Sequence, residues 1–227
     1  MKQPFFKFLL FFTILTLTGC LGDDVDIEND RRILVKGKVM DNLGNPLPNI
    51  SIVTSAHLDL LGQTRSDASG NFSLISLDEQ FDPLDIFINV DNFYNLNIND
   101  DYSSRSYFSE IRNNILLHDL GTIVLGKKAL LNFTFNNLPG DENTLVYKIK
   151  FTPANCELPL NVFDPPENCD LGADIEGDFN PNSENRTLNI ESVLGTKIIL
   201  EYSLNFEPTQ TIEISLTNLE SNYVFEY

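Results

Sequence analysis

Apolar residues alternate with polar residues along almost the whole of this 227-residue chain. In the segment from Ile198 to Phe206, for example, an apolar side chain falls at every second position. A period of two places successive side chains on opposite faces of an extended strand, so one face enters a core and the other meets water. The same pattern occurs in residues 33–39, 86–90, 131–135, 145–151, 212–216 and 223–227. It predicts an all-β protein built from half-buried antiparallel strands.

Turn-forming residues separate these segments and divide the chain. Gly, Pro, Asn and Asp cluster at residues 42–46, 69–71 and 139–141, where they favour tight turns. Many short strands with such turns are typical of β-sandwiches. We expect two tandem sandwiches of the immunoglobulin or transthyretin kind, residues 33–126 and 128–227, with the boundary at Gly126-Lys127-Lys128. A short helix is also predicted around residues 104–118, where Phe108, Ile111 and Ile115 fall near helical spacing.

Residues 33–126 carry motifs that resemble a known domain family. The chain reads VKGKVMD from Val35, GNPLP from Gly44, TRSDASGNF from Thr64 and DLGTIVL from Asp119. This progression resembles the carboxypeptidase regulatory-like (transthyretin-like) domain, with mild departures at Arg65-Ser66-Asp67 and at 92–94. The resemblance implies a seven-stranded sandwich with no catalytic residues of its own. Residues 128–227 resemble no family, and their alternation predicts a second sandwich of about six or seven strands.

The N-terminus has the pattern of an exported, lipid-anchored protein. Lys2 and Lys7 precede an apolar run over residues 8–17, which is followed by Leu17-Thr18-Gly19-Cys20. This tetrapeptide resembles the bacterial lipobox, which implies removal of residues 1–19 and attachment of diacylglycerol to the Cys20 thiol. An ordinary signal peptide with a chance Cys is the alternative. The resemblance implies a membrane partner held through the N-terminal lipid, and no second run of about 18 apolar residues predicts a spanning helix.

Residues 20–32 form an acidic segment behind the lipidated Cys20. Five acids fall within residues 21–30, a composition that predicts a solvated, extended tether. A similar acidic run in some Gram-negative phyla resembles the signal for display on the outer face of the outer membrane. We therefore expect a lipid-anchored outer-membrane protein at the cell surface, with a periplasm-facing anchor as the alternative.

The two remaining cysteines, Cys156 and Cys169, are an even pair in a chain with an export signal. Oxidising compartments favour a disulfide between them, and closing a loop of this length stabilises the fold by about 3 kcal/mol. A metal pair or a reactive thiol is the alternative. It is disfavoured because the chain has two His residues, neither near these cysteines in the sequence.

The formal net charge of −18 excludes one class of partner. Removal of Lys2 and Lys7 with the signal makes the mature chain more negative by two charges. Phosphate backbones are bound by clustered Lys and Arg, and this sequence has no basic stripe. We therefore expect no nucleic-acid partner.

Catalytic and cofactor motifs are absent from the sequence. His57 and His118 stand outside any recognisable motif, and no P-loop, Gly-x-Ser-x-Gly or His-Glu-x-x-His pattern occurs. We predict no catalytic residue, no metal and no cofactor. The acidic run 174–184 has alternating oxygen side chains that could suit calcium, but it departs from the EF-hand spacing and a solvated loop is favoured. Sugars could stack on the tyrosines in place of Trp, although core packing is favoured for these rings: Tyr94, Tyr102 and Tyr107.

These observations favour a non-catalytic binding or structural module that presents loops to a protein or glycan partner. One alternative is a degradative glycan or peptide hydrolase with its site in residues 128–227. Another is an envelope assembly subunit that pairs through an exposed strand such as Tyr223 to Tyr227, although a last core strand is favoured there.

Overall fold

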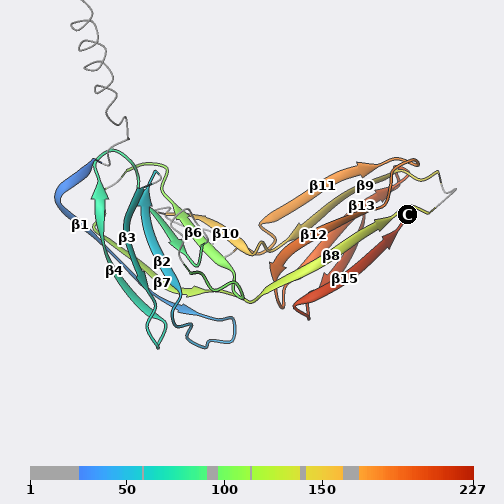
Figure 1. Cartoon of the computed structure of the whole chain (residues 1–227). Helices are drawn as coiled ribbons and strands as arrows, with labels where there is room; N and C mark the ends of the chain where they lie inside the picture. The colour runs from blue at the N-terminus through green and yellow to red at the C-terminus, as the bar shows by residue number, and fades with distance from the viewer. Residues whose placement is uncertain (1–25, 58, 91–96, 113, 139–141, 161–168) are drawn as a thin grey trace, which may run out of the picture.

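The computed structural model describes residues 26–57, 59–90, 97–112, 114–138, 142–160 and 169–227. Within these ranges the chain forms fifteen strands and no helix, arranged as two β-sandwiches (Figure 1). The prediction of an all-β protein is therefore confirmed. None of the described residues forms a helix with the length and apolar character needed to cross a membrane.

The first sandwich contains the seven strands that precede Gly126. β1, the longest, lies between β4 and β7 in one sheet, and the other sheet has the order β6-β5-β2-β3. The strands are β1 (Ile27–Met40), β2 (Ser51–Ala56), β3 (Asp59–Arg65), β4 (Asn71–Glu79), β5 (Asp85–Ile88), β6 (Ser104–Phe108) and β7 (Leu117–Val124).

The second sandwich begins at Lys128. Its sheets have the orders β12-β8-β15 and β11-β9-β13-β14. The strands are β8 (Lys128–Asn136), β9 (Leu145–Phe151), β11 (Ala173–Phe179), β12 (Arg186–Val193), β13 (Lys197–Leu204), β14 (Gln210–Ser215) and β15 (Glu220–Glu226).

Both sandwiches have one and the same topology. In each, the first strand is antiparallel to the fourth and parallel to the seventh, while the third, second, fifth and sixth strands form the opposite sheet in that order. The partners of the second and fifth strands are antiparallel in both cases. The second half of the chain, for which the sequence suggested no family, therefore repeats the strand order of the first half.

The strand β10 (Asn155–Pro159) falls outside this repeat. By sequence it belongs to the second sandwich, where it lies between β9 and β11, but it pairs in parallel with β6 of the first sandwich. The expected division of the chain into residues 33–126 and 128–227 did not foresee this pairing. The five-stranded sheet β10-β6-β5-β2-β3 is thus built from both halves of the chain.

Each sandwich has its own core, and the cores differ in character. The first is mainly aliphatic and includes Val35, Ile52 and Ile86. The second contains a group of aromatic rings centred on Phe135, whose ring centroid lies 4.4 Å from that of Tyr147 and 5.0 Å from that of Phe179. Val35, Ile86, Phe135 and Tyr147 belong to the predicted period-two segments, so the pattern located part of each core, whereas Ile52 and Phe179 lie outside those segments.

Two local expectations need revision. The helix predicted around residues 104–118 is wrong, because β6 is an inner strand between β5 and β10, and Ile111 is 75% exposed rather than buried on a helix face. The segment Tyr223 to Tyr227 was expected to be either an exposed edge strand or the last core strand, and it has features of both. It lies in and just after β15, an edge strand beside β8, and it also buries Phe225 and Tyr227 in the second core.

Candidate functional site

A groove of about 880 Å³ lies where the two sandwiches meet. One wall is the edge strand β7, the opposite wall is formed by β6 and β10, and the β12–β13 turn of the second sandwich closes one end. Its apolar lining comes from both halves of the chain and includes Ile115, Leu117, Leu120, Leu158, Leu160 and Val193. Concave, mainly apolar sites of this size are typical of ligand pockets.

The strand β10 builds one wall of this groove and joins the two sandwiches. Its residues Asn155 to Pro159 pair with Ser104 to Phe108 of β6. The Ser104 hydroxyl donates to Asn155 Oδ1 at 2.6 Å, and the Leu160 N–H donates to the Phe108 carbonyl at 2.6 Å. The predicted disulfide between Cys156 and Cys169 is present and ties β10 to the chain just before β11, with a Cα–Cα distance of 5.9 Å.

A second set of contacts fixes the direct connection between β7 and β8. The Ser103 N–H donates to the Gly126 carbonyl at 2.8 Å, and the Gly126 N–H donates to the Ser103 hydroxyl at 3.1 Å. A Cβ atom at Gly126 would lie 2.2 Å from Val193 Cγ1, so the close approach of the β12–β13 turn requires glycine here. Together with β10, these contacts make the junction a stiff connection rather than a free linker.

The polar lining of the groove includes a guanidinium, an imidazole and a phenol, together with the carboxylates of Asp119 and Asp170. Arg105 donates through Nε to the Val124 carbonyl at 3.2 Å and through Nη1 to Cys156 Sγ at 3.4 Å, which spans the groove from β7 to β10. Burial lowers the pKa of His118, against the opposing influence of Asp78, so the imidazole is mainly neutral at pH 7. Burial likewise raises the pKa of Tyr107, with Arg105 acting in the opposite direction, and the phenol stays protonated.

A neutral imidazole can serve as a general base only if it reaches a proton to abstract. Among the described residues, no hydrogen bond joins the His118 imidazole to a hydroxyl or thiol. The groove therefore presents hydrogen-bonding groups on an apolar surface, and its described residues do not assemble a nucleophile with its base.

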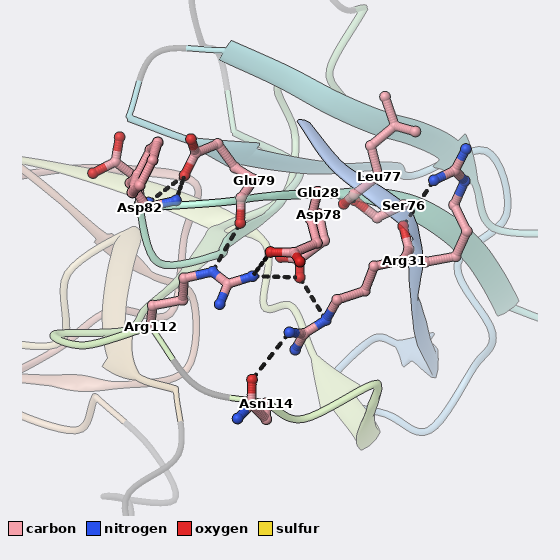
Figure 2. A network of polar contacts seen from close by, with 11 residues as sticks. Glu28, Arg31, Ser76, Leu77, Asp78, Glu79, Asp82, Arg112 and Asn114 are labelled. Carbon is pink, nitrogen blue, oxygen red and sulfur yellow. Dashed lines mark hydrogen bonds and ion pairs between the residues drawn. The ribbon is translucent and has the colours of Figure 1, made fainter. Parts of the chain in front are cut away.

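A network of ions surrounds the buried carboxylate of Asp78 at the start of the first sandwich (Figure 2). The carboxylate of Asp78, only 4% exposed, lies 2.7 Å from Arg31 Nε and 3.1 Å from Arg112 Nη2. Arg112 also contacts Glu28 at 2.9 Å and donates through Nε to the Glu79 carbonyl at 2.8 Å. These residues come from the beginning of β1, the end of β4 and the β6–β7 loop, so the network fastens three segments together. Removing the Arg partners of Asp78 would leave its buried charge uncompensated, which is destabilising.

The structure separates most of the residues singled out in the sequence. Cys20, the signal 1–19 and Tyr94 lie outside the described residues. Tyr102 and Tyr107 are partly buried and pack against the first core, as favoured for them, and Tyr107 also lines the groove. His57 is exposed in the β2–β3 turn, where it adopts a φ of 54°, whereas His118 lines the groove.

The acidic run 174–184 begins as a regular strand rather than a loop. Asp174, Glu176 and Asp178 alternate along the exposed face of β11. Lys148 of β9 forms ion pairs with Asp174 and with Glu176, the latter at 3.6 Å. No group of three or more His, Cys, Asp or Glu side chains in the described part of the chain is placed to hold a metal ion.

Sequence reasoning missed the groove because it missed β10. One signal was present, since Ala154, Cys156, Leu158 and Leu160 continue the period-two pattern and are all buried. This segment was not among the strands predicted from the sequence.

Comparisons with known proteins do not assign the chain to a family. No protein-family model matches the sequence, and no curated protein matches it. The carboxypeptidase regulatory-like and lipobox resemblances therefore stay predictions.

Several solved structures resemble the fold weakly. They include the tip fimbrial protein Mfa3 from Porphyromonas gingivalis, with 11% identity and a TM-score of 0.29 over 81% of each chain. The Bacillus anthracis TIE protein has 9% identity and a TM-score of 0.31 over 87% of this chain, which spans only 34% of that protein. The 3-chlorocatechol 1,2-dioxygenase from Rhodococcus opacus 1CP has 14% identity and a TM-score of 0.27 over 45% of this chain and 64% of that one. All three TM-scores are below 0.5, so these likenesses carry no argument about function.

Proposed function

We propose that the chain is a lipid-anchored, non-catalytic module of the cell surface, in which two sandwiches form a stiff arm that holds a binding surface away from the membrane. The observation that supports this proposal is the β10 joint. Domains joined only by a linker move relative to each other by default. Here the second sandwich is held to the first by the pairing of β10 with β6, by the disulfide that ties β10 to the chain before β11, and by the tight Gly126–Val193 contact.

The anchoring part of the proposal is supported by the sequence. Leu17-Thr18-Gly19-Cys20 follows an apolar run, and two acyl chains are sufficient for stable membrane attachment. The acidic tether that follows is repelled by anionic lipid headgroups, which suits a segment that keeps the folded part off the membrane.

Protease treatment of intact cells tests the location. We expect the mature chain, detected by antibody, to disappear while a periplasmic control protein survives. The matched variant Cys20→Ala should leave the membrane fraction, because it lacks the lipidated thiol. Full protection of the wild-type chain would overturn surface display and would favour an envelope assembly role facing the periplasm. Membrane retention of a Cys20→Ala chain that has lost residues 1–19 would overturn lipid anchoring.

The groove supports a second candidate function, a hydrolase acting on a bound glycan or peptide. The observation in its favour is that His118 lines the groove with a lowered pKa. Incubating the purified mature chain with glycan, peptide and ester substrates tests it, with His118→Asn as the control. Turnover that His118→Asn abolishes would establish the hydrolase and overturn the non-catalytic proposal.

A further inference from the structure

We propose that the first sandwich is built to carry mechanical tension between the tether and the second sandwich, because its first and last strands are loaded in shear. This inference rests on the proposed function, since anchoring at one side and a bound partner at the other would supply the tension. The mechanical property itself belongs to the folded chain and can be measured without a membrane.

The shear geometry follows from the parallel pairing of β1 with β7. The chain enters the sandwich through β1 and leaves it through β7 toward β8, at opposite ends of the sandwich (Figure 1). β1 and β7 are hydrogen-bonded in parallel from Leu34–Leu117 to Met40–Val124. A pull on the start of β1 and the end of β7 therefore acts in opposite directions along adjacent strands. Such a pull slides one strand past the other and loads the whole ladder at once, rather than opening it one hydrogen bond at a time.

β1 is held on both sides. Besides its ladder with β7, it pairs with β4 from Ile27–Glu79 to Lys38–Asn71. Its residues Ile33, Val35 and Val39 are buried in the first core. Sliding β1 along its axis therefore requires both ladders to break and these side chains to leave the core.

The ion network reinforces the point where tension would enter. Glu28 and Arg31 lie near the start of β1, where the pulling force would enter the sandwich. Glu28 contacts Arg112 at 2.9 Å, and Arg31 contacts Asp78 at 2.7 Å. Arg112 belongs to the loop before β7, and Asp78 belongs to β4. The start of β1 is thus fastened by charge-assisted contacts to the two elements past which it would slide (Figure 2).

The exit is reinforced as well. The Leu125 N–H donates to the Met40 carbonyl at 2.9 Å, which extends the β1–β7 ladder past the end of β7. The pairing of β10 with β6 provides a second connection into the second sandwich. In that sandwich the first strand β8 is also parallel to the last strand β15.

Single-molecule force spectroscopy on the purified mature chain tests the proposal. In the first geometry, handles are attached at the N-terminus and the C-terminus. In the second, the N-terminal handle is moved to Leu43, an 82% exposed position just beyond the end of β1. Pulling from Leu43 opens the β1–β7 ladder from its Met40–Val124 end, while the second sandwich is loaded identically in both geometries.

We expect the first sandwich to unfold at a force at least about twofold higher in the N-terminal geometry than in the Leu43 geometry, because forced unfolding follows the barrier along the pulled direction. Equal forces would overturn the proposal. Arg112→Gln should lower the force in the N-terminal geometry and leave the Leu43 geometry unchanged. If Arg112→Gln does not fold, Glu28→Gln removes one contact of the same network. An equal drop in both geometries would mean that the network only stabilises the fold.

The two proposals can fail separately. Loss of surface display in the protease experiment would remove the source of tension and leave the force measurement intact. Equal forces in the two pulling geometries would overturn the mechanical inference and leave anchoring and display untouched.

Discussion

Removing the disulfide should loosen β10 more than any strand of the first sandwich. Cys156 lies in β10 and Cys169 lies just before β11, so the bond closes a loop with a sequence separation of 13 residues. On the chain-entropy model such a loop contributes about 3 kcal/mol to the free energy of global unfolding. The double variant Cys156→Ser/Cys169→Ser should lose this amount in urea unfolding, and reduction of the wild-type chain should give the same result.

The free energy of local opening of β10 should fall by less than the free energy of global unfolding. While β9 and β11 remain paired, the Phe151–Ala173 register already closes the chain around the same segment. The disulfide loop 156–169 lies inside the larger loop that the Phe151–Ala173 pairing keeps closed. Removing the bond therefore releases less chain entropy than it does in the fully unfolded chain, about 2 kcal/mol on the same model. This corresponds to a roughly 30-fold increase in the population of the opened state.

Hydrogen exchange followed by mass spectrometry measures that population. We expect amides of β10, and those of β6 that pair with it, to exchange about 30-fold faster in the double variant. Amides of the β1–β4 ladder exchange only through larger openings, so they report the loss of global stability separately from the local opening of β10. Unchanged exchange across residues 155–159 would refute the reasoning, since it would mean that the pairing with β6 holds β10 without help from the bond.

Two further predictions concern stability. Burial raises the pKa of Asp85 from 3.8 to about 6, against the hydrogen bond from the Ser109 N–H. The folded chain holds this proton more tightly than the unfolded chain, so stability falls as pH rises between about 4 and 6. Asp85→Asn should flatten that decline and raise the urea-derived free energy of unfolding at pH 7.5 by about 1–2 kcal/mol after solvent screening is allowed for; an unaltered pH profile would contradict this. Gly126→Ala should destabilise the junction by about 1–3 kcal/mol in thermal unfolding because its Cβ would overlap Val193, and adding Val193→Ala should restore most of the loss.

The strand pattern and the cores could be predicted from the sequence because they depend on local alternation. Leu131, Phe133 and Phe135 occupy every second position of β8, and all three are fully buried. Alternation reports which face of a strand is covered, but it does not report which strand lies beside it. For that reason the repeated topology of the second sandwich was not foreseen, although five of its seven strands were; β11 and β12 were not predicted.

The candidate site depends on pairing that no local pattern encodes. Ser104 and Asn155 are 51 residues apart, and their contact brings β10 beside β6. The same long-range pairing explains the wrong helix. Spacing near 3.6 residues at Phe108, Ile111 and Ile115 predicted a buried helical face. Instead, the chain is a strand of the sheet up to Phe108, where β6 ends. Ile111 is left exposed in the loop that carries Arg112 to the ion network.

The β10 joint also predicts how the chain can be divided. A chain that stops at residue 127 keeps all seven strands of the first sandwich but leaves the edge of β6 unpaired and removes Leu160 from the first core. Unpaired edges promote association with other strands, and burying one Leu side chain stabilises a fold by about 1.5–3 kcal/mol. We therefore expect residues 26–127 alone to unfold at lower temperature than the first sandwich does within the full chain, and to self-associate in sedimentation velocity. A synthetic peptide spanning residues 152–160 should reverse both effects, whereas a peptide with Leu158 and Leu160 replaced by Ser should not. A monomeric fragment of unchanged stability would mean that β10 only rests on the first sandwich, and the stiff arm would then depend on the Gly126 connection alone.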